Sequence, residues 1–271
     1  MEYINILSFL ISLILSYIAA PMIMDMLYRS NTVSLNYNKE EIPLGMGILF
    51  VLIQVISMGF FMILNWVDLN VAMTYLMAFV LMGLVGLLDD LVGEKDIKGF
   101  KGHIKAFFKG IMTTGLLKAG MGFFLALFIS IIFSKSILDI VINTLVISLF
   151  TNLINLFDLR PGRSIKVFLL MSIIMLLTSA IIEYNFILYS IYGILFIYFP
   201  IDLKAKAMMG DVGSNAIGIT LGVYCILTQT MLARLIYLLI LVVVHILAEK
   251  ISFTKIIENN KLLNFLDNLG R

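Results

Sequence analysis

Charge is scarce in this sequence of 271 residues. Charged side chains make up 13% of it, well below the roughly 25% that is typical of soluble domains. Apolar residues make up 61%, which excludes an ordinary water-soluble fold and indicates a membrane protein. Cysteine is almost absent as well. The single Cys225 lies in an apolar run, so the sequence offers neither a disulfide framework nor a cysteine-ligated metal site.

The apolar residues form runs long enough to cross a bilayer, since a spanning helix needs about 20 of them. These runs are uninterrupted and lack the alternation of barrel strands, so we predict an all-α polytopic membrane helix bundle. The first run is too long for a signal peptide and lacks a basic leader, so we expect it to be the first span. About nine spans are expected, at residues 3–24, 44–65, 71–88, 111–133, 137–155, 165–182, 186–201, 212–230 and 232–252.

We expect one integral membrane domain over residues 1–271, with an amphipathic tail from about residue 253. Basic residues are unequally divided between the two sets of loops. The short loops at 65–70, 134–136, 183–185 and 228–234 carry only Lys135 and Arg234, whereas the opposite loops and the tail are rich in lysine and arginine. The positive-inside rule therefore predicts an amino terminus outside the cell and a cytoplasmic tail, with the long loops and any chemistry on the cytoplasmic face.

One predicted span ends in two adjacent carboxylates, in the run Gly86-Leu87-Leu88-Asp89-Asp90. Neighbouring carboxylates repel each other, so one of them is costly to keep ionised unless a cation lies nearby. Carboxylates and cations together at a membrane surface suit the handling of phosphates, whereas the alternative is a solvated helix end. The available cations are a metal ion or the lysines that follow, Lys95, Lys98, Lys101 and Lys105.

The lysine-rich run that follows has two interpretations. It either lies along the membrane interface with its lysines among the headgroups, or supplies cations to a diphosphate. Lys118 is different, because it lies inside a predicted span, where an ionisable residue normally faces the bundle interior and has a partner. The candidate partners of Lys118 are Asp89, Asp90 and Asp211. His103 is expected to be a solvated loop residue.

A row of polar residues ends another predicted span. Asn152, Asn155 and Asp158 are spaced three apart, so they share one helical face. Two carboxamides and a carboxylate on one stripe offer either oxygen ligands or a reader for the edge of a base. Arg160 and Arg163 follow at once, and their forked guanidinium groups suit phosphate.

Glycines mark two other helix starts. Gly210 and Gly213 flank Asp211, an arrangement that offers free backbone amides and a carboxylate for a hard cation such as Mg²⁺. Alternatively, Asp211 is the N-cap of that helix. Gly45 and Gly47 form either a plain turn, a close approach of two backbones, or an anion site. His245, inside the last predicted span, is expected to be buried and hydrogen-bonded rather than catalytic.

Taken together, these motifs resemble the polyprenyl-phosphate N-acetylhexosamine-1-phosphate transferase family, which includes phospho-MurNAc-pentapeptide translocase and its GlcNAc-1-phosphate relatives. The resemblance covers residues from about 42 to 222 and includes a weaker match at Ile42-Pro43 with the glycines that follow. The strong matches are the 86–90 run, the row from Asn152 to Asp158, and the run Met209-Gly210-Asp211-Val212-Gly213-Ser214.

The resemblance implies transfer of an N-acetylhexosamine 1-phosphate from a UDP-sugar to undecaprenyl phosphate, with release of UMP, in cell-envelope glycan synthesis. It implies a bacterial plasma-membrane enzyme, with membrane lipids around it, no nucleic-acid partner, and a homodimer as one possible assembly. Asp211 would be the Mg²⁺ ligand. Asp89 and Asp90 would position or deprotonate the carrier phosphate, and Asp90 would also reach the metal. The remaining implied contacts to nucleotide or phosphate are Asn152, Asn155, Asp158, Gly210, Lys105, Lys118, Arg160 and Arg163.

The chain departs from the family pattern in two places, so we expect that nucleotide-sugar recognition is altered or that activity is lost. The family usually continues its Asn/Asp row with Gly-x-Asp-Gly, but here Leu159-Arg160-Pro161-Gly162-Arg163 follows, without a second carboxylate. The family's histidine-rich loop is not apparent near His245. The alternative is a non-catalytic membrane protein or regulator that binds the carrier lipid. A transporter is disfavoured because the polar residues lie at helix ends rather than at the midplane, and the Asp-Gly-x-x-Ala-Arg signature of CDP-alcohol phosphotransferases is absent.

Overall fold

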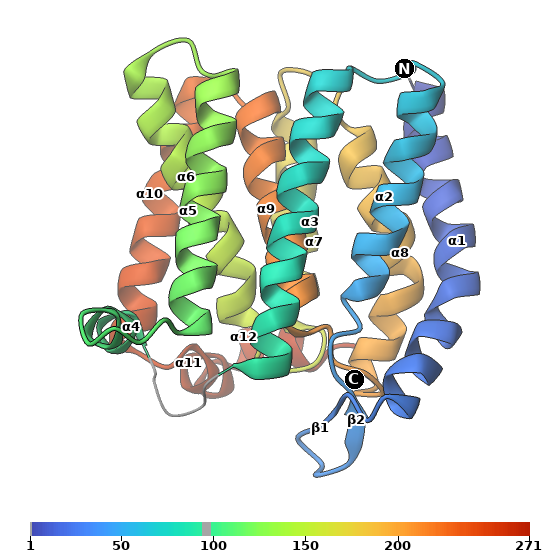
Figure 1. Cartoon of the computed structure of the whole chain (residues 1–271), viewed down its shortest axis with the longest axis vertical. Coiled ribbons are helices and arrows are strands. Elements are labelled where there is room, and N and C mark those ends of the chain that lie inside the picture. Colours follow the sequence, from blue (N-terminus) through green and yellow to red (C-terminus); the bar gives the residue numbers. More distant parts are fainter. Residues whose placement is uncertain (1, 94–98) are drawn as a thin grey trace.

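A computed structural model describes residues 2–93 and 99–271, so the predictions on Lys95 and Lys98 lie outside the described residues. The described chain is almost wholly helical (Figure 1). Its elements are α1 (Glu2–Arg29), β1 (Val33–Leu35), β2 (Glu41–Pro43), α2 (Ile48–Ile63), α3 (Leu69–Val92), α4 (Gly99–Phe107), α5 (Thr114–Phe133), α6 (Ile137–Phe157), α7 (Arg163–Thr178), α8 (Phe186–Leu203), α9 (Gly210–Thr228), α10 (Met231–Lys250), α11 (Phe253–Asn259) and α12 (Lys261–Asn268).

The all-α membrane bundle is confirmed. Seven of the described helices are long and apolar enough to cross a membrane, namely α1, α3, α5, α6, α8, α9 and α10. Helices α2 and α7 stand among them in Figure 1 but have only 16 residues each, so the expected count of nine spans is not confirmed. Helices α4, α11 and α12 lie across one end of the bundle, together with the hairpin of β1 and β2. We call this the polar end.

Helix α9 is the central helix of the bundle (Figure 1). In the most apolar stretch of α9, 89% of the residues are buried, whereas the corresponding share for α10 is 11%. Glycines allow this enclosure, because small residues let the backbones of membrane helices approach closely. A Cβ atom at Gly218 would lie 2.7 Å from the Thr151 carbonyl oxygen of α6, and one at Gly222 would lie 2.6 Å from the Ile147 Cα atom. Helix α9 is thus held against α6 by its own glycine spacing.

A neutral hydrogen-bonded network joins five helices in the interior. Ser12 of α1 bonds Ser57 of α2 (3.2 Å) and Ser190 of α8 (2.9 Å). Gln54 of α2 donates to the Tyr75 hydroxyl of α3 (3.1 Å). Every member is fully buried and hydrogen-bonded, as polar groups inside a membrane must be. We call Ser12, Gln54, Ser57, Tyr75, Ser190 and Thr220 the buried polar network.

The connection between α1 and α2 is a β-hairpin, which the sequence did not predict. Strands β1 and β2 are antiparallel, and Asn36 holds the turn by accepting from the backbone amides of Asn38 and Glu40, each at 2.9 Å. The prediction that the second span begins at residue 44 is wrong. The Met46 and Gly47 amides donate to the carbonyls of residues 208 and 209, so α2 begins only at Ile48.

Candidate functional site

An ion cluster lies at the polar end, where α3 ends and α5 and α9 begin. The Lys118 ammonium of α5 donates to Asp89 Oδ2 of α3 at 2.8 Å and also pairs with Asp211 Oδ2 of α9. Their side chains are between 18% and 24% exposed, so the group is mostly buried yet reachable from solvent. Two of the three partners predicted for Lys118 are confirmed. We call Asp89, Lys118 and Asp211 the triad.

Helix α6 adds an amide to the triad. With its amide oriented to satisfy both neighbours, Asn155 donates to Asp211 Oδ1 at 2.9 Å and accepts from Lys118 Nζ at 3.1 Å. Four helices therefore meet at one point, and each of the three strong sequence motifs contributes a side chain there. The convergence brings together residues from 89 to 211.

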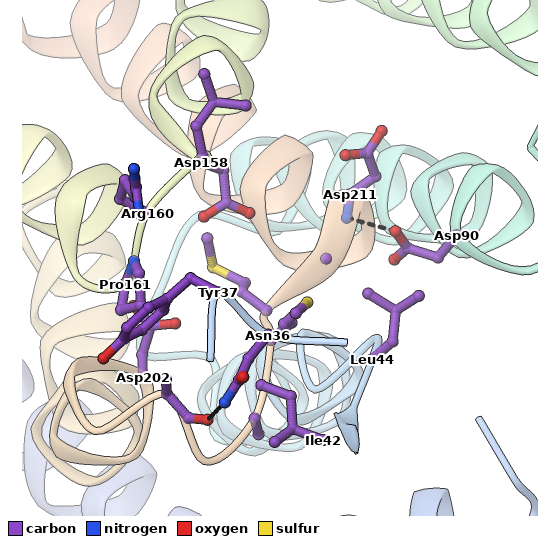
Figure 2. Close-up of a pocket in the computed structure, with 16 residues that line it drawn as sticks. Asn36, Tyr37, Ile42, Leu44, Asp90, Asp158, Arg160, Pro161, Asp202 and Asp211 are labelled. Atoms are coloured by element: carbon purple, nitrogen blue, oxygen red, sulfur yellow. Dashed lines mark hydrogen bonds between the residues drawn. The ribbon is translucent and has the colours of Figure 1, made fainter. Parts of the chain in front are cut away.

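The Asp90 carboxylate has different hydrogen-bond partners from the carboxylate of its neighbour, Asp89. Its carboxylate accepts from the backbone amides of Asp211 (2.9 Å) and Val212 (3.2 Å), so a residue of α3 caps the first turn of α9 (Figure 2). Gly210 makes room for this cap, since its φ is +72° and a Cβ atom there would lie 2.3 Å from Asp90 Oδ2. The alternative that Asp211 itself caps α9 is wrong, and its side chain is left for Lys118 and Asn155.

Glycines also set the spacing between the backbones of α2, α3 and α9. A Cβ atom at Gly86 would lie 2.3 Å from the Asp211 carbonyl oxygen, and one at Gly47 would lie 2.2 Å from the Gly213 amide nitrogen. The interpretation of Gly47 as a close approach of two backbones is therefore confirmed. The position of Asp211 relative to α3 therefore depends on direct backbone contact as well as on the Asp90 cap.

A first pocket of about 250 Å³ lies between the hairpin and the ends of α3, α6, α8 and α9 (Figure 2). We call it the hairpin pocket. Asn36 and Tyr37 line it from the hairpin, and Arg160 lines it from the connection between α6 and α7. Four carboxylates surround it, those of Asp90, Asp158, Asp202 and Asp211. The ionisable lining of this pocket therefore comes mainly from aspartates, with the Arg160 guanidinium among them.

Asp158 follows the last residue of α6 and faces the hairpin pocket. Its carboxyl accepts from the Ser164 hydroxyl at 2.7 Å. Burial and the nearby Asp202 carboxylate raise the pKa of Asp158 to about 8, so the group is protonated at neutral pH. A neutral carboxyl can both donate and accept a hydrogen bond, which suits recognition of a polar, uncharged edge.

A second pocket of about 570 Å³ lies along α5 and α6, and we call it the α5–α6 pocket. Asp89, Lys118 and Asn152 line it near the polar end, whereas Phe123 and Leu149 line it farther along the helices. The pocket therefore has a charged end and a more apolar run between spanning helices. The triad borders both pockets, because Asp211 faces the hairpin pocket while Asp89 and Lys118 face the other.

The structure does not bring every predicted site residue to these pockets. Lys105 is exposed on α4 and lines neither pocket. Arg163 also lines neither, because its guanidinium is bound to Asp267 and Thr254. Arg160 lines the hairpin pocket and pairs with Glu258 at 3.5 Å.

Both histidines have hydrogen-bond partners. His245 bonds the Leu241 carbonyl at 2.8 Å, which confirms the hydrogen bond expected of it. The expectation of a solvated loop is wrong for His103, which lies on α4, bonds Thr113 at 2.8 Å and lines the α5–α6 pocket.

Sequence reasoning missed Asn36, Tyr37 and Asp202 as pocket residues. Asn36 and Asn38 are turn-forming residues on either side of Tyr37, and this spacing was the only local signal for the hairpin. Asp202, two residues beyond Pro200, carried no signal of its own. It accepts from the Gly162 amide at 2.6 Å, a contact between residues 40 positions apart.

The carboxylate oxygens of the triad are candidate ligands for Mg²⁺. Among the described residues, no group of three or more His, Cys, Asp or Glu side chains could hold a metal ion. Mg²⁺ at phosphate sites, however, typically takes one or two carboxylates and fills its other positions with water and substrate oxygens. Asp89 and Asp211 are two carboxylates that already share one cation, the Lys118 ammonium, with the Asn155 amide beside them. The oxygen donors present fit a hard cation that arrives with a phosphate.

The sequence model of glycosyl transferase family 4 matches residues 72–229. The matched stretch runs from α3 to the end of α9 and contains the triad, Asn155 and Asp158, whereas the hairpin and the tail lie outside it. No curated protein matches the chain.

Proposed function

Since the chain belongs to glycosyl transferase family 4, the family of polyprenyl-phosphate hexosamine-1-phosphate transferases, we propose that it transfers an N-acetylhexosamine 1-phosphate from a UDP-sugar to undecaprenyl phosphate. UMP is the second product. The observation that carries this proposal is the position of the triad between two pockets of different character. The reaction joins a water-soluble donor to a membrane-bound acceptor. It therefore needs two adjoining binding sites with charged residues where the two sites meet.

The hairpin pocket is the proposed donor site. The neutral Asp158 carboxyl can bond the edge of the uracil ring, and Arg160 can contact the diphosphate. Asp211 borders the same pocket, so the diphosphate would lie next to the triad. This assignment keeps the nucleotide at the polar end, which we propose faces the cytoplasm of a bacterium.

The α5–α6 pocket is the proposed acceptor site. Lys118 at its charged end supplies a cation for the carrier phosphate, while Phe123 and Leu149 extend an apolar surface along the helices for the first isoprenoid units. Lys118 also contacts Asp211 across the cluster, so both substrates would share one cation. The arrangement favours direct transfer between two phosphates rather than a covalent enzyme intermediate.

In this reaction an oxygen of the carrier phosphate attacks the sugar-linked phosphorus of the donor. The bond from that phosphorus to the oxygen bridging to UMP breaks, and UMP leaves with that oxygen. Such transfers depend on positioning and on neutralising the anionic oxygens. Asp89, Asp211 and Asn155 would hold Mg²⁺, which when bound supplies neutralising charge. Lys118 draws the two phosphates together, and Asp90 holds Asp211 in place through the α9 cap.

A second candidate is a non-catalytic protein that binds the carrier lipid in envelope assembly. The occupied Arg163 favours it, because a residue that follows the Asn/Asp row is engaged by the tail rather than left free for substrate. On this hypothesis the α5–α6 pocket would still bind undecaprenyl phosphate, but no UMP would be formed.

One experiment separates the two candidates. Purified protein is incubated with undecaprenyl phosphate, Mg²⁺ and a panel of UDP-N-acetylhexosamines that includes UDP-MurNAc-pentapeptide, and UMP is measured. We expect UMP from at least one donor and a loss of about 100-fold in kcat for Asp211→Asn. The matched control is Asp68→Asn, at the far end of α3, where Asp68 only caps the helix. Lipid binding without turnover would favour the second candidate, and unchanged turnover in Asp211→Asn would contradict the first.

A further inference from the structure

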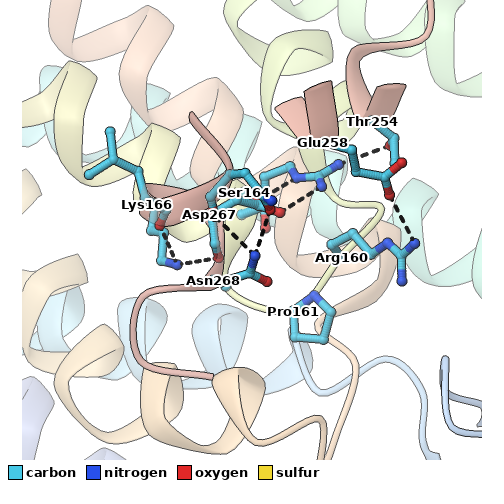
Figure 3. Close-up of polar contacts among 12 residues, drawn as sticks. Arg160, Pro161, Ser164, Lys166, Thr254, Glu258, Asp267 and Asn268 are labelled. Atoms are coloured by element: carbon cyan, nitrogen blue, oxygen red, sulfur yellow. Dashed lines mark hydrogen bonds and ion pairs between the residues drawn. The ribbon is translucent and has the colours of Figure 1, made fainter. Parts of the chain in front are cut away.

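The carboxy-terminal segment returns to the polar end and binds the connection between α6 and α7 (Figure 3). Asp267 of α12 forms two parallel hydrogen bonds with Arg163, from Nε to Oδ1 and from Nη2 to Oδ2, both at 2.8 Å. Arg163 Nη1 donates to the Thr254 hydroxyl of α11 at 3.0 Å. The Arg163 and Asp267 side chains are 5% and 9% exposed, so this is a buried, bidentate ion pair.

Further contacts hold the same connection. Lys166 donates to the Leu266 carbonyl at 2.9 Å and to the Asp267 carbonyl at 2.7 Å, beside the buried pair. Arg271 donates to the Pro161 carbonyl at 2.8 Å and pairs with Asp267 at 3.1 Å. The tail is thus fastened at several points to residues 161–166, which begin α7 and precede it.

The other side of this connection faces the hairpin pocket. Asp158, Arg160 and Pro161 line that pocket, and the Gly162 amide donates to Asp202, another lining residue. Residues 158–161 therefore form one wall of the pocket, and the tail lies behind that wall. No residue of α11 or α12 lines the pocket itself, so these two helices contact its wall from behind.

The ion pair is built to persist at neutral pH. Burial acts to raise the pKa of Asp267, but the hydrogen bonds and charge of Arg163, with the charge of Arg271, hold it below its ordinary value. Removing one partner of a buried pair leaves the other charge buried without compensation. Loss of the Asp267 charge would therefore free the Arg163 side chain and, with it, the backbone segment that precedes Arg163.

We infer that Asp267 is a positioning residue for the donor: through Arg163, the tail fixes the 158–161 wall and so sets the affinity of the hairpin pocket for the nucleotide. This inference rests on the proposed function of that pocket. The Arg163 side chain does not line the pocket. On this inference it acts on the pocket by anchoring the backbone of the wall that precedes it. The tail also adds a control of donor binding from outside the stretch that matches the family.

The test is Asp267→Asn in the full chain, which keeps the size of the side chain and removes its charge. We expect KM for the UDP-sugar to rise about tenfold, with kcat within about twofold and KM for undecaprenyl phosphate unchanged. Asp267→Glu, which keeps the charge, should restore most of the donor affinity. The matched control is Asp25→Asn, which breaks an exposed Arg–Asp pair of 2.8 Å on α1 and should leave both KM values unchanged.

Binding of UDP by calorimetry, without acceptor, gives a readout that does not depend on turnover. Weaker UDP binding in Asp267→Asn supports the inference even if no donor is turned over, in which case only the proposed reaction fails. Turnover with an unchanged donor KM overturns the inference and leaves the reaction standing. A lower melting temperature with unchanged UDP affinity also overturns it, because the tail would then serve stability alone.

A milder variant covers the case in which Asp267→Asn does not fold. Thr254→Val removes only the hydroxyl that accepts from Arg163 Nη1 and fills nearly the same volume. We expect a rise of about two- to threefold in donor KM or in the Kd for UDP, in the same direction as the larger change. Unchanged affinity in a folded Thr254→Val protein, together with an Asp267→Asn protein that does not fold, overturns the inference.

Discussion

The buried polar network and the triad are two polar assemblies in one membrane bundle, and they differ in almost every physical respect. The network is neutral, fully buried and hydrogen-bonded throughout, and none of its residues lines either pocket. The triad is charged, about one-fifth exposed, and borders both pockets. Polarity inside a membrane protein therefore does not by itself indicate a site. Charge that has access to a pocket does.

The difference follows from what burial costs in each case. Neutral hydroxyl and amide groups inside a membrane need only one another, and each satisfied bond between helices adds modestly to stability. Carboxylates and ammonium groups lose far more on leaving water, so a buried charge cluster is weak evidence for stability and strong evidence for another purpose. Mutations in the two assemblies should therefore separate activity from stability.

The largest effect is expected for Lys118→Met. It removes the cation shared by Asp89 and Asp211 and leaves their carboxylates facing each other, so we expect kcat to fall about 1000-fold. Release of UMP by the purified protein measures this, with size-exclusion chromatography as the check on folding. Lys118→Arg keeps the charge and should lose much less. Activity within fivefold of the wild type in Lys118→Met would remove the triad from the mechanism, and the triad would then be structural like the buried polar network.

An opposite pattern is expected for Gln54→Leu in the buried polar network. It removes the amide that links Tyr75 and Ser190, so the protein should lose about 1–3 kcal/mol of stability. At a temperature where it stays folded, its turnover should remain within about threefold of the wild type. Thermal unfolding in detergent and the UMP assay measure the two quantities separately. A large loss of turnover without a loss of stability would show that the network also serves the reaction.

A further expected effect is a dependence of stability on pH through Asp158. Its pKa is about 8 in the folded protein and near 3.8 when the group is free, so the folded state binds the proton more tightly. Stability from this group should therefore be greatest below about pH 4, fall as the pH rises towards 8, and level off above. Melting temperatures between pH 5 and 8 should decline in the wild type and decline less in Asp158→Asn. Equal slopes in the two proteins would show that Asp158 is already ionised.

Much of the fold could be predicted from the sequence, because uninterrupted apolar runs permit only helices in a membrane. Lys118 was also informative, since a charge inside a span needs a partner and few acids were available. The hairpin was not predicted, because its strands have three residues each and carry no long β-pattern. Its backbone pairing with residues 208 and 209 shortens α2 in a way that hydropathy cannot show.

The roles of individual charged residues were harder to predict than their presence. Asp89 and Asp90 are adjacent and chemically identical, yet one binds Lys118 and the other caps a helix more than 100 residues away. Arg163 was expected to bind phosphate, but a guanidinium fork fits a carboxylate equally well. Which anion it meets depends on where the tail folds back, and that depends on contacts between residues 104 positions apart.

The contact between Gly86 and the Asp211 carbonyl oxygen bears on how mutational surveys of this protein should be interpreted. Gly86 has no side chain to offer a substrate, but a single methyl group there would meet the backbone of α9 at 2.3 Å. A random-mutagenesis screen would consequently record inactive clones at Gly86 and Gly47 as readily as at the acids. Ranking positions by lost activity alone would therefore count these glycines among the residues that contact substrate. Binding measurements on each clone are needed to separate the glycines that set backbone spacing from the side chains that bind substrate.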